Sequence, residues 1–122
     1  MIAYLIDYEG TLDLLKDPIS AVRTLKARGH VVVLWSASCG STIDRDHPGL
    51  RREFHHIAPK DSGLDFLLWL KEEEHRDLDQ VVYVDDDPWW KDHAENSERL
   101  QMLGLHWGYE DPREFWKLLG AT

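Results

Sequence analysis

Two apolar segments, one at the start of the chain and one in its second half, run directly into acidic residues. Residues 2–6 are followed by Asp7 and Glu9, and residues 80–84 are followed by three aspartates at positions 85–87. Aliphatic and β-branched runs of this length predict buried strands. A buried strand rarely ends in several acids unless these are solvated, cap a helix or hold a metal ion. The repeated pattern therefore predicts a sheet that gathers carboxylates at the ends of two of its strands.

Strand and helix patterns alternate along the chain. We predict further strands at residues 30–35, 55–58 and 105–107, and helices at residues 18–28, 50–54, 62–75, 97–103 and 112–119. Such alternation implies right-handed crossovers and a mainly parallel sheet with helices on both faces. The near-continuous apolar run at residues 30–35 is typical of a strand buried on both faces. We therefore expect an α/β fold, a three-layer α/β/α Rossmann-like arrangement, in a single domain over residues 1–122.

Polar residues mark where three of the helices are expected to begin. Asp17 stands before Pro18, a pairing of N-cap and first-turn proline. Ser62 with Asp65 three residues later is a capping-box pattern. Asp87 stands directly before a proline and is interpreted as an N-cap rather than as a ligand. These signals place acids at helix starts as well as at strand ends.

Composition narrows the classes of partner. The net charge is −9 at pH 7 with histidine neutral, which disfavours broad binding to nucleic acids or anionic membranes. The lone Cys39 excludes an internal disulfide and a cysteine-based zinc cluster. Asp7 interrupts the first apolar run, and no apolar segment approaches the roughly 20 residues of a membrane span. We therefore expect a cytoplasmic protein without a leader or membrane anchor.

The predicted strand ends carry the polar residues from which a site could be built. Asp7 and Glu9 follow the first strand, Ser36 the second, Lys60 comes just after the third, and residues 85–87 follow the fourth. Open parallel sheets bind ligands beyond these ends, where strand order reverses. Crowded carboxylates cannot all stay ionised without a cation, and oxygen ligands without clustered histidines indicate Mg²⁺. A carboxylate, a hydroxyl, an ammonium group and Mg²⁺ together suit phosphoryl transfer.

These segments resemble the four motifs of the haloacid dehalogenase (HAD) superfamily. Residues 7–12, Asp-Tyr-Glu-Gly-Thr-Leu, resemble the first motif, in which Asp-x-Asp-Gly-Thr follows the first strand. Ser36 matches the second motif, Lys60 the third, and the pair Asp85-Asp86 the fourth. Their order and strand-end placement extend over nearly the whole chain. The resemblance implies a HAD-like core and a hydrolase of the phosphatase type that acts on phosphoric esters.

The resemblance also implies a role for each matching residue. Asp7 would be the nucleophile that becomes phosphorylated. Ser36 and Ala37 would bind the phosphoryl oxygens, and Lys60 would neutralise both the phosphoryl group and the Asp7 carboxylate. From the residues alone, Ser38 stands as the alternative to Ser36.

Mg²⁺ is the cofactor that the resemblance implies. It would lie between Asp7, the backbone carbonyl of Glu9 and Asp85, with Asp86 supporting the metal or the lysine. The chain departs from the family pattern at Glu9, because its phosphatases usually carry Asp there as general acid and base. Glu keeps the titratable group, so the first half-reaction is still compatible with this residue. A displacement of about 1 Å can cost about two orders of magnitude in rate, so efficient turnover is the step at risk.

The resemblance is to the branch of the family without a cap domain. Only about ten residues separate Asp7 from Pro18, and residues 59–61 alone separate the third strand from the next helix. Open sites of this branch often act on macromolecular phosphoesters or are closed by a neighbouring subunit. The expected partner is a phosphorylated substrate, either a small molecule or a macromolecular phosphoester, and an oligomer is compatible with the sequence.

Two rival hypotheses share these residues. One is a binding or regulatory module that keeps the fold and metal site but turns over poorly, motivated by Glu9. The other is a phosphotransferase that passes the phosphoryl group to an acceptor other than water. The phosphotransferase shares every residue of the site with the phosphohydrolase, and the module shares the fold and the metal site, so the sequence does not separate them.

Two tryptophans and three histidines are the remaining residues considered for a binding site. Trp89 and Trp90 form either an aromatic wall for a substrate ring or a packing contact with the neighbouring helix. His55, His56 and His106 have no carboxylate or cysteine partner at ligand spacing. We therefore interpret these histidines as core or surface residues.

Overall fold

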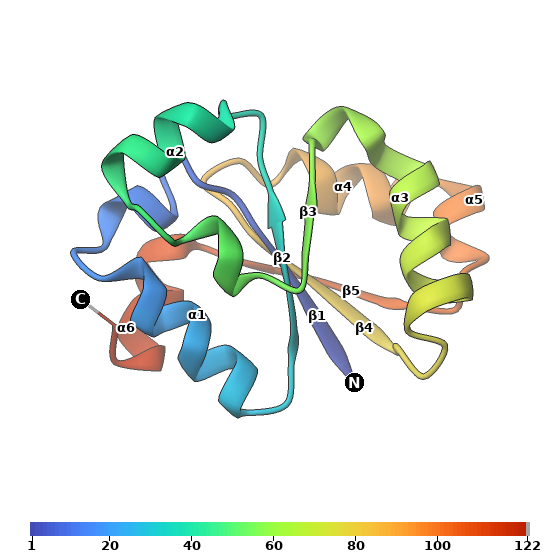
Figure 1. Ribbon diagram of the computed structural model, residues 1–122. Coiled ribbons are helices and arrows are strands. Elements are labelled where there is room, and N and C mark those ends of the chain that lie inside the picture. Colours follow the sequence, from blue (N-terminus) through green and yellow to red (C-terminus); the bar gives the residue numbers. More distant parts are fainter. Residues whose placement is uncertain (122) are drawn as a thin grey trace.

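The chain alternates parallel strands with helices (Figure 1). The computed structural model describes residues 1–121. The strands are β1 (Ile2–Ile6), β2 (Val31–Trp35), β3 (His56–Ala58), β4 (Gln80–Val84) and β5 (His106–Glu110). The α-helices are α1 (Pro18–Ala27), α2 (Gly40–Asp46), α3 (Gly63–Trp69), α4 (Trp89–Asn96), α5 (Glu98–Gln101) and α6 (Pro112–Leu119). The remaining turns are the 3₁₀ segments η1 (Leu12–Leu14), η2 (Arg51–Glu53) and η3 (Lys60–Ser62), and the π-helix η4 (Leu70–Glu74).

The five strands form one sheet in the order β3-β2-β1-β4-β5, and all four pairings are parallel. The predicted α/β class and parallel sheet are confirmed. The chain first adds strands on one side of β1 and then crosses to the other side with β4. Strand order therefore reverses between β1 and β4, which is the point where open α/β sheets form ligand sites.

Helices cover both faces of the sheet, which gives three layers. One buried core lies between the sheet and helices α1, α2 and α6, and a second lies between the opposite face and α3, η4, α4 and α5. In Figure 1 these two helix groups flank the twisted sheet on opposite sides. All five residues of β2 are buried, as its unbroken apolar sequence predicts. Burial of this kind contributes about 1.5–3 kcal/mol for each large aliphatic side chain.

One of the predicted helix starts is confirmed at the level of a single contact. The Asp17 carboxylate accepts a hydrogen bond from the Ser20 N–H at 3.1 Å, and α1 begins at Pro18. The Asp87 carboxylate accepts a hydrogen bond from the Trp89 N–H at 3.0 Å, but the N-cap of α4 is Pro88, so the N-cap predicted at Asp87 lies one residue too early.

The predicted capping box at the start of α3 is wrong. Ser62 has helical backbone angles and belongs to η3. Its hydroxyl donates to the Pro59 carbonyl at 2.6 Å and makes no capping bond to the helix. The helix predicted for residues 62–75 is instead α3 followed by the wider π-helical turn η4.

Other boundaries differ where the apolar pattern is weak. Helix α2 was not predicted, because Ile43 is its one buried residue and its sequence is polar throughout. The helix predicted at residues 50–54 is the short 3₁₀ turn η2. The helix predicted at residues 97–103 is the four-residue α5, and the last strand is β5 rather than residues 105–107. Among residues 1–121, no helix has the length and apolar character that crossing a bilayer requires.

Candidate functional site

Two buried carboxylates lie side by side where strand order reverses. Ile6 of β1 pairs with Val84 of β4, and the ladder continues one step further because the Asp7 N–H donates to the Val84 carbonyl at 3.0 Å. Asp7 and Asp85 therefore leave the sheet at the same level. Their exposed fractions are 6% and 2%. The parallel pairing of β1 and β4 is thus what brings together acids that are 78 positions apart.

Lys60 bridges the two carboxylates from the other side of β2. Its ammonium nitrogen lies 3.2 Å from Asp7 Oδ2 and 2.7 Å from Asp85 Oδ2. Lys60 begins η3, two residues after the end of β3. The long lysine side chain spans from this edge of the sheet to the β1–β4 junction. One cation therefore partly neutralises two buried anions.

The pKa values of this group follow from burial and mutual charge. Burial raises the pKa of Asp7, and the Lys60 ammonium opposes part of that rise. Burial alone would lower the pKa of Lys60, but its hydrogen bond to Asp85 and the charges of both aspartates raise it overall. The lysine is therefore charged at neutral pH.

Asp86 completes a group of three carboxylates. One oxygen of each of Asp7, Asp85 and Asp86 lies within 4.8 Å of the others. A hydrogen bond with Asp85, then burial and the Asp85 charge, raises the pKa of Asp86. The Asp87 N–H donates to Asp85 Oδ1 at 3.0 Å and orients that carboxylate. Three carboxylates this close together could hold a metal ion through their oxygen atoms.

Gly10 lets the chain pass close to Asp86. It has φ +74°, and a Cβ placed there would lie 2.3 Å from Asp86 Oδ2. Only glycine satisfies both the backbone angle and the space. The adjacent turn is held by the Asp13 carboxylate, which accepts from the Gly10 N–H at 2.8 Å. The position of Asp86 thus depends on the Gly10-Thr11 segment of the first motif.

A pocket opens over these residues. It is lined by Asp7, Glu9, Gly10, Ala37, Ser38, Lys60 and Asp86. Glu9 is exposed at this pocket, on the turn that follows β1. Five of the predicted site residues, Asp7, Glu9, Ala37, Lys60 and Asp86, therefore share one pocket.

Ser36 and Ser38 have different positions around this pocket. Ser36 is buried at the end of β2, where its Oγ accepts a hydrogen bond from the Ser38 N–H at 3.0 Å. Ser38 lines the pocket above Asp7 and also a neighbouring pocket. Ser36 lines the neighbouring pocket. The Ser36 hydroxyl thus orders the loop, and Ala37 and Ser38 present that loop to Asp7.

The two consecutive tryptophans differ in their environment. Trp90 packs edge-to-face on Trp35 of β2, with ring centroids 5.2 Å apart, and lies against Gly63 of α3. Trp89 is 53% exposed and stacks on His93, with ring centroids 5.0 Å apart. The packing interpretation is confirmed for Trp90. Neither tryptophan lines the pocket above Asp7.

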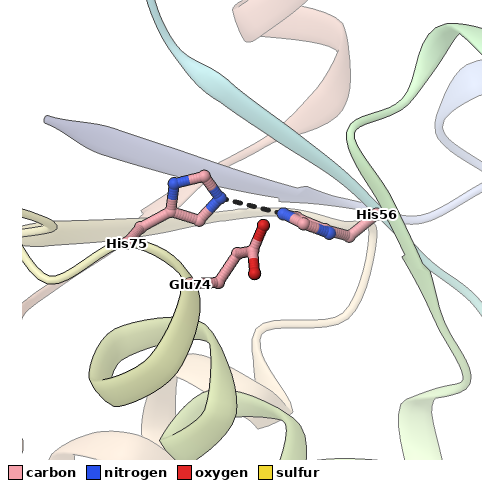
Figure 2. A group of neighbouring side chains, drawn as sticks. All are labelled: His56, Glu74 and His75. Carbon is pink, nitrogen blue, oxygen red and sulfur yellow. Dashed lines mark hydrogen bonds between the residues drawn. The ribbon is translucent and has the colours of Figure 1, made fainter.

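One grouping was not found from the sequence. His56 lies beside Glu74 and His75 (Figure 2), although no carboxylate stands at ligand spacing from it in the sequence. The three residues come from β3 and from the end of η4, and no fixed sequence spacing connects those elements. His55, by contrast, accepts a hydrogen bond from the Val32 N–H at 3.0 Å, which is a structural role.

No family model matches the chain, and neither a curated protein nor a solved structure matches it. The function of the pocket is therefore inferred from the arrangement of its own side chains.

Proposed function

We propose that this protein is a Mg²⁺-dependent phosphohydrolase of the HAD type that acts through an aspartyl phosphate on Asp7. The observation that carries the proposal is the Lys60 bridge between Asp7 and Asp85 at the point where strand order reverses. A buried carboxylate beside an ammonium group and two further carboxylates is suited to in-line attack on phosphorus. The four-motif resemblance supports the same assignment.

The metal-binding residues in this proposal are Asp7, Asp85 and Asp86, with the Glu9 carbonyl. When bound, Mg²⁺ would offset the charge of the carboxylates and of the phosphoryl oxygens. Lys60 would stabilise the developing charge from the opposite side, and its ammonium group favours the ionised form of Asp7 against the effect of burial. The loop at Ala37 and Ser38 presents polar groups to the phosphoryl oxygens.

Asp7 and Glu9 together account for the bonds and protons of the proposed reaction. An Asp7 oxygen attacks phosphorus, the bond from phosphorus to the leaving oxygen breaks, and the Glu9 carboxyl gives that oxygen a proton. The Glu9 carboxylate then takes a proton from water, whose oxygen attacks phosphorus. Phosphate leaves and the Asp7 carboxylate is restored. Glu9 is exposed at the pocket, which suits a residue that exchanges protons with substrate and solvent.

The connections around the site support the capless type of HAD enzyme. Eleven residues, 7–17, join β1 to α1, and η3 follows β3 after one residue. The pocket therefore lies open above the strand ends, where a phosphorylated macromolecule or a small phosphoester held with a partner subunit could enter. Residues 37–54 flank it and are the proposed specificity segment.

Substitution of the nucleophile tests the proposal. Asp7→Asn should abolish hydrolysis of an aryl phosphate in the presence of Mg²⁺, while Asp65→Asn, an exposed aspartate on α3, should leave it unchanged. Mass spectrometry of acid-quenched protein should detect phosphorylated Asp7 in the wild type. Unchanged turnover in the Asp7→Asn variant would overturn the assignment.

Glu9 supports a second candidate, a module of the same fold that turns over poorly. Its longer side chain is a specific departure from the phosphatase pattern. Glu9→Asp distinguishes the two: a large gain in turnover indicates a naturally impaired site, and a loss indicates a turn built around Glu. Product analysis with added alcohols separates hydrolysis from phosphotransfer.

A further inference from the structure

A second group of metal-binding side chains lies at the opposite end of β3 from Lys60. His56 is the first residue of β3, Glu74 ends η4, and His75 follows it. Four residues of extended chain, from position 56 to position 60, span about 13 Å. The group is therefore separate from the carboxylates at the carboxyl ends of the strands.

The two imidazoles face each other through their Nε2 atoms. These atoms are 2.9 Å apart, and Figure 2 shows the Glu74 carboxylate directed toward the space between the rings. One nitrogen or oxygen from each of the three residues lies within 4.8 Å of the others. Two ring nitrogens, which share one proton in this hydrogen bond, and a carboxylate thus lie close together.

The chemistry of these donors suits a transition-metal dication. Two imidazoles and a carboxylate are a common zinc ligand set, with metal–ligand distances of about 2.0–2.2 Å. At 2.1 Å from one ion, nitrogens 2.9 Å apart subtend an angle of about 90°, and opening them to about 3.4 Å would give a tetrahedral angle. Glu74 is exposed, so its carboxylate is free to adjust. Mg²⁺ prefers oxygen ligands and suits this group poorly.

The backbone around His75 is held in place by several contacts. The His75 N–H donates to the Leu70 carbonyl at 2.8 Å, the bond that closes the π-helical turn. The Leu78 N–H donates to the His75 carbonyl at 3.0 Å, and the Lys71 ammonium group donates to the Leu78 carbonyl. On the other side, His56 packs edge-to-face with Trp69, with ring centroids 5.1 Å apart. The ligands are therefore largely pre-organised.

The π-helical turn has a specific consequence for this group. A regular α-helix has hydrogen bonds between residues four positions apart, whereas the π turn joins residues five positions apart and so contains one extra residue. Glu74 is the last residue of this turn, His75 follows it, and both lie beside His56. Such turns occur frequently at functional sites, and here the turn ends at the donor pair.

We propose that His56, Glu74 and His75 bind a transition-metal dication of the Zn²⁺ class, with a remaining position open to solvent. The ion replaces the proton shared by the two imidazoles and ties the edge strand β3 to the end of η4. It stabilises the native fold, because the unfolded chain does not hold the three donors together. This site does not depend on the function proposed for Asp7.

Zn²⁺ titration of the metal-free protein tests the proposal by calorimetry and thermal unfolding. The wild type should bind one Zn²⁺ at this site and unfold at a higher temperature with Zn²⁺ present. His56→Ala and His75→Ala should each weaken binding by more than about 100-fold, the upper range for loss of a mere supporting residue. His106→Ala, which removes an exposed histidine on β5, is the matched control and should bind normally.

Nitrogen NMR of the unmodified protein provides a measurement that does not depend on any variant. Zn²⁺ should shift the Nε2 resonances of His56 and His75 and leave that of His106 unchanged. The proposal is overturned if those two resonances do not move, or if Zn²⁺ binding is lost in Asp7→Asn and retained in the histidine variants. In either case the two imidazoles form only a hydrogen-bonded pair.

Discussion

The two groups of side chains proposed to bind metals lie at opposite ends of the strands and are built differently. The carboxylate group uses residues directly after β1 and β4, and two of its members are almost fully buried. The histidine group uses the start of an edge strand and the end of a π-helix, and its members are half-buried or exposed. The first presents hard oxygen donors beside a lysine. The histidine group presents two borderline nitrogen donors and one carboxylate, and it contains no lysine.

The comparison shows two ways in which a fold brings side chains together. Parallel strands bring their carboxyl ends to one level, so acids after two strands meet whatever lies between them. No such rule joins the start of β3 to the end of η4. That contact requires the packing of a particular helix against a particular strand.

The largest effect on turnover and stability is expected for substitution of Lys60, which belongs to the carboxylate group and has no counterpart in the histidine group. Lys60→Met keeps the apolar stem but leaves Asp7 and Asp85 without their cation. Turnover of a phosphoester should fall by about two to three orders of magnitude, as for loss of one charge-stabilising group. Unfolding in urea should show a loss of about 3 kcal/mol, since buried charges become unpaired.

Lys16→Met is the control for this substitution, because Lys16 is exposed. It should change neither turnover nor the urea midpoint. If Lys60→Met proved as active and as stable as Lys16→Met, the bridge between the two carboxylates would have no energetic significance. Added Mg²⁺ should restore part of the stability of Lys60→Met, because the metal takes over the charge compensation.

A pair of substitutions should separate the two groups by metal preference. Asp85→Asn should weaken Mg²⁺ binding by at least about tenfold and leave Zn²⁺ binding intact, and His75→Ala should do the reverse. The physical reason is that each metal selects its donor type, oxygen for Mg²⁺ and nitrogen for Zn²⁺. Calorimetric titration of both metals into both variants measures this. A variant that lost both metals equally would indicate one shared site.

The carboxylate group was predictable because each member carries a local sequence signal. Asp7 and Asp85 each follow an apolar run, and Lys60 stands just after a short strand with turn residues around it. The sheet and most strand bounds followed from the same apolar runs. Neither required knowledge of long-range packing.

The parts that escaped prediction are those fixed by contacts between distant elements. Helix α2 buries one residue and so leaves no apolar stripe in the sequence. Ser62 matches a capping pattern, yet its hydroxyl bonds to Pro59 because the preceding turn is already helical. His56 and His75 lie 19 positions apart, on β3 and just after η4, and no sequence spacing signals the contact between them.

A smaller effect is expected at the glycine of the first motif. Gly10→Ala should cost about 1–2 kcal/mol from its positive φ alone. Gly29→Ala is a matched control, because Gly29 has φ +85° and nothing within 4 Å of the added methyl group. In addition, Gly10→Ala should displace Asp86 and weaken Mg²⁺ binding by about tenfold, the effect of disturbing a ligand's support. Equal Mg²⁺ affinity in the two variants would contradict this role of Gly10.

The smallest effect concerns the strand that carries Asp85. The Tyr83 hydroxyl is buried on β4 and has no hydrogen-bond partner among residues 1–121. Burial raises the pKa of Tyr83, so above about pH 10 the unfolded chain ionises while the folded chain does not. The free energy of unfolding should therefore fall with rising pH there, by up to about 1.4 kcal/mol per pH unit for this group.

Tyr83→Phe should remove that alkaline loss and keep the stack on Trp107, whose ring centroid lies 6.2 Å away. At pH 7 it should stabilise the fold by about 1 kcal/mol, because a buried hydroxyl without a partner disappears. Urea unfolding at pH 7 and at pH 11 measures both changes. A destabilised variant at pH 7 would mean that the hydroxyl is paired in solution. Retained Mg²⁺ and Zn²⁺ affinities would show that the strand supports Asp85 by its backbone register, not by this side chain.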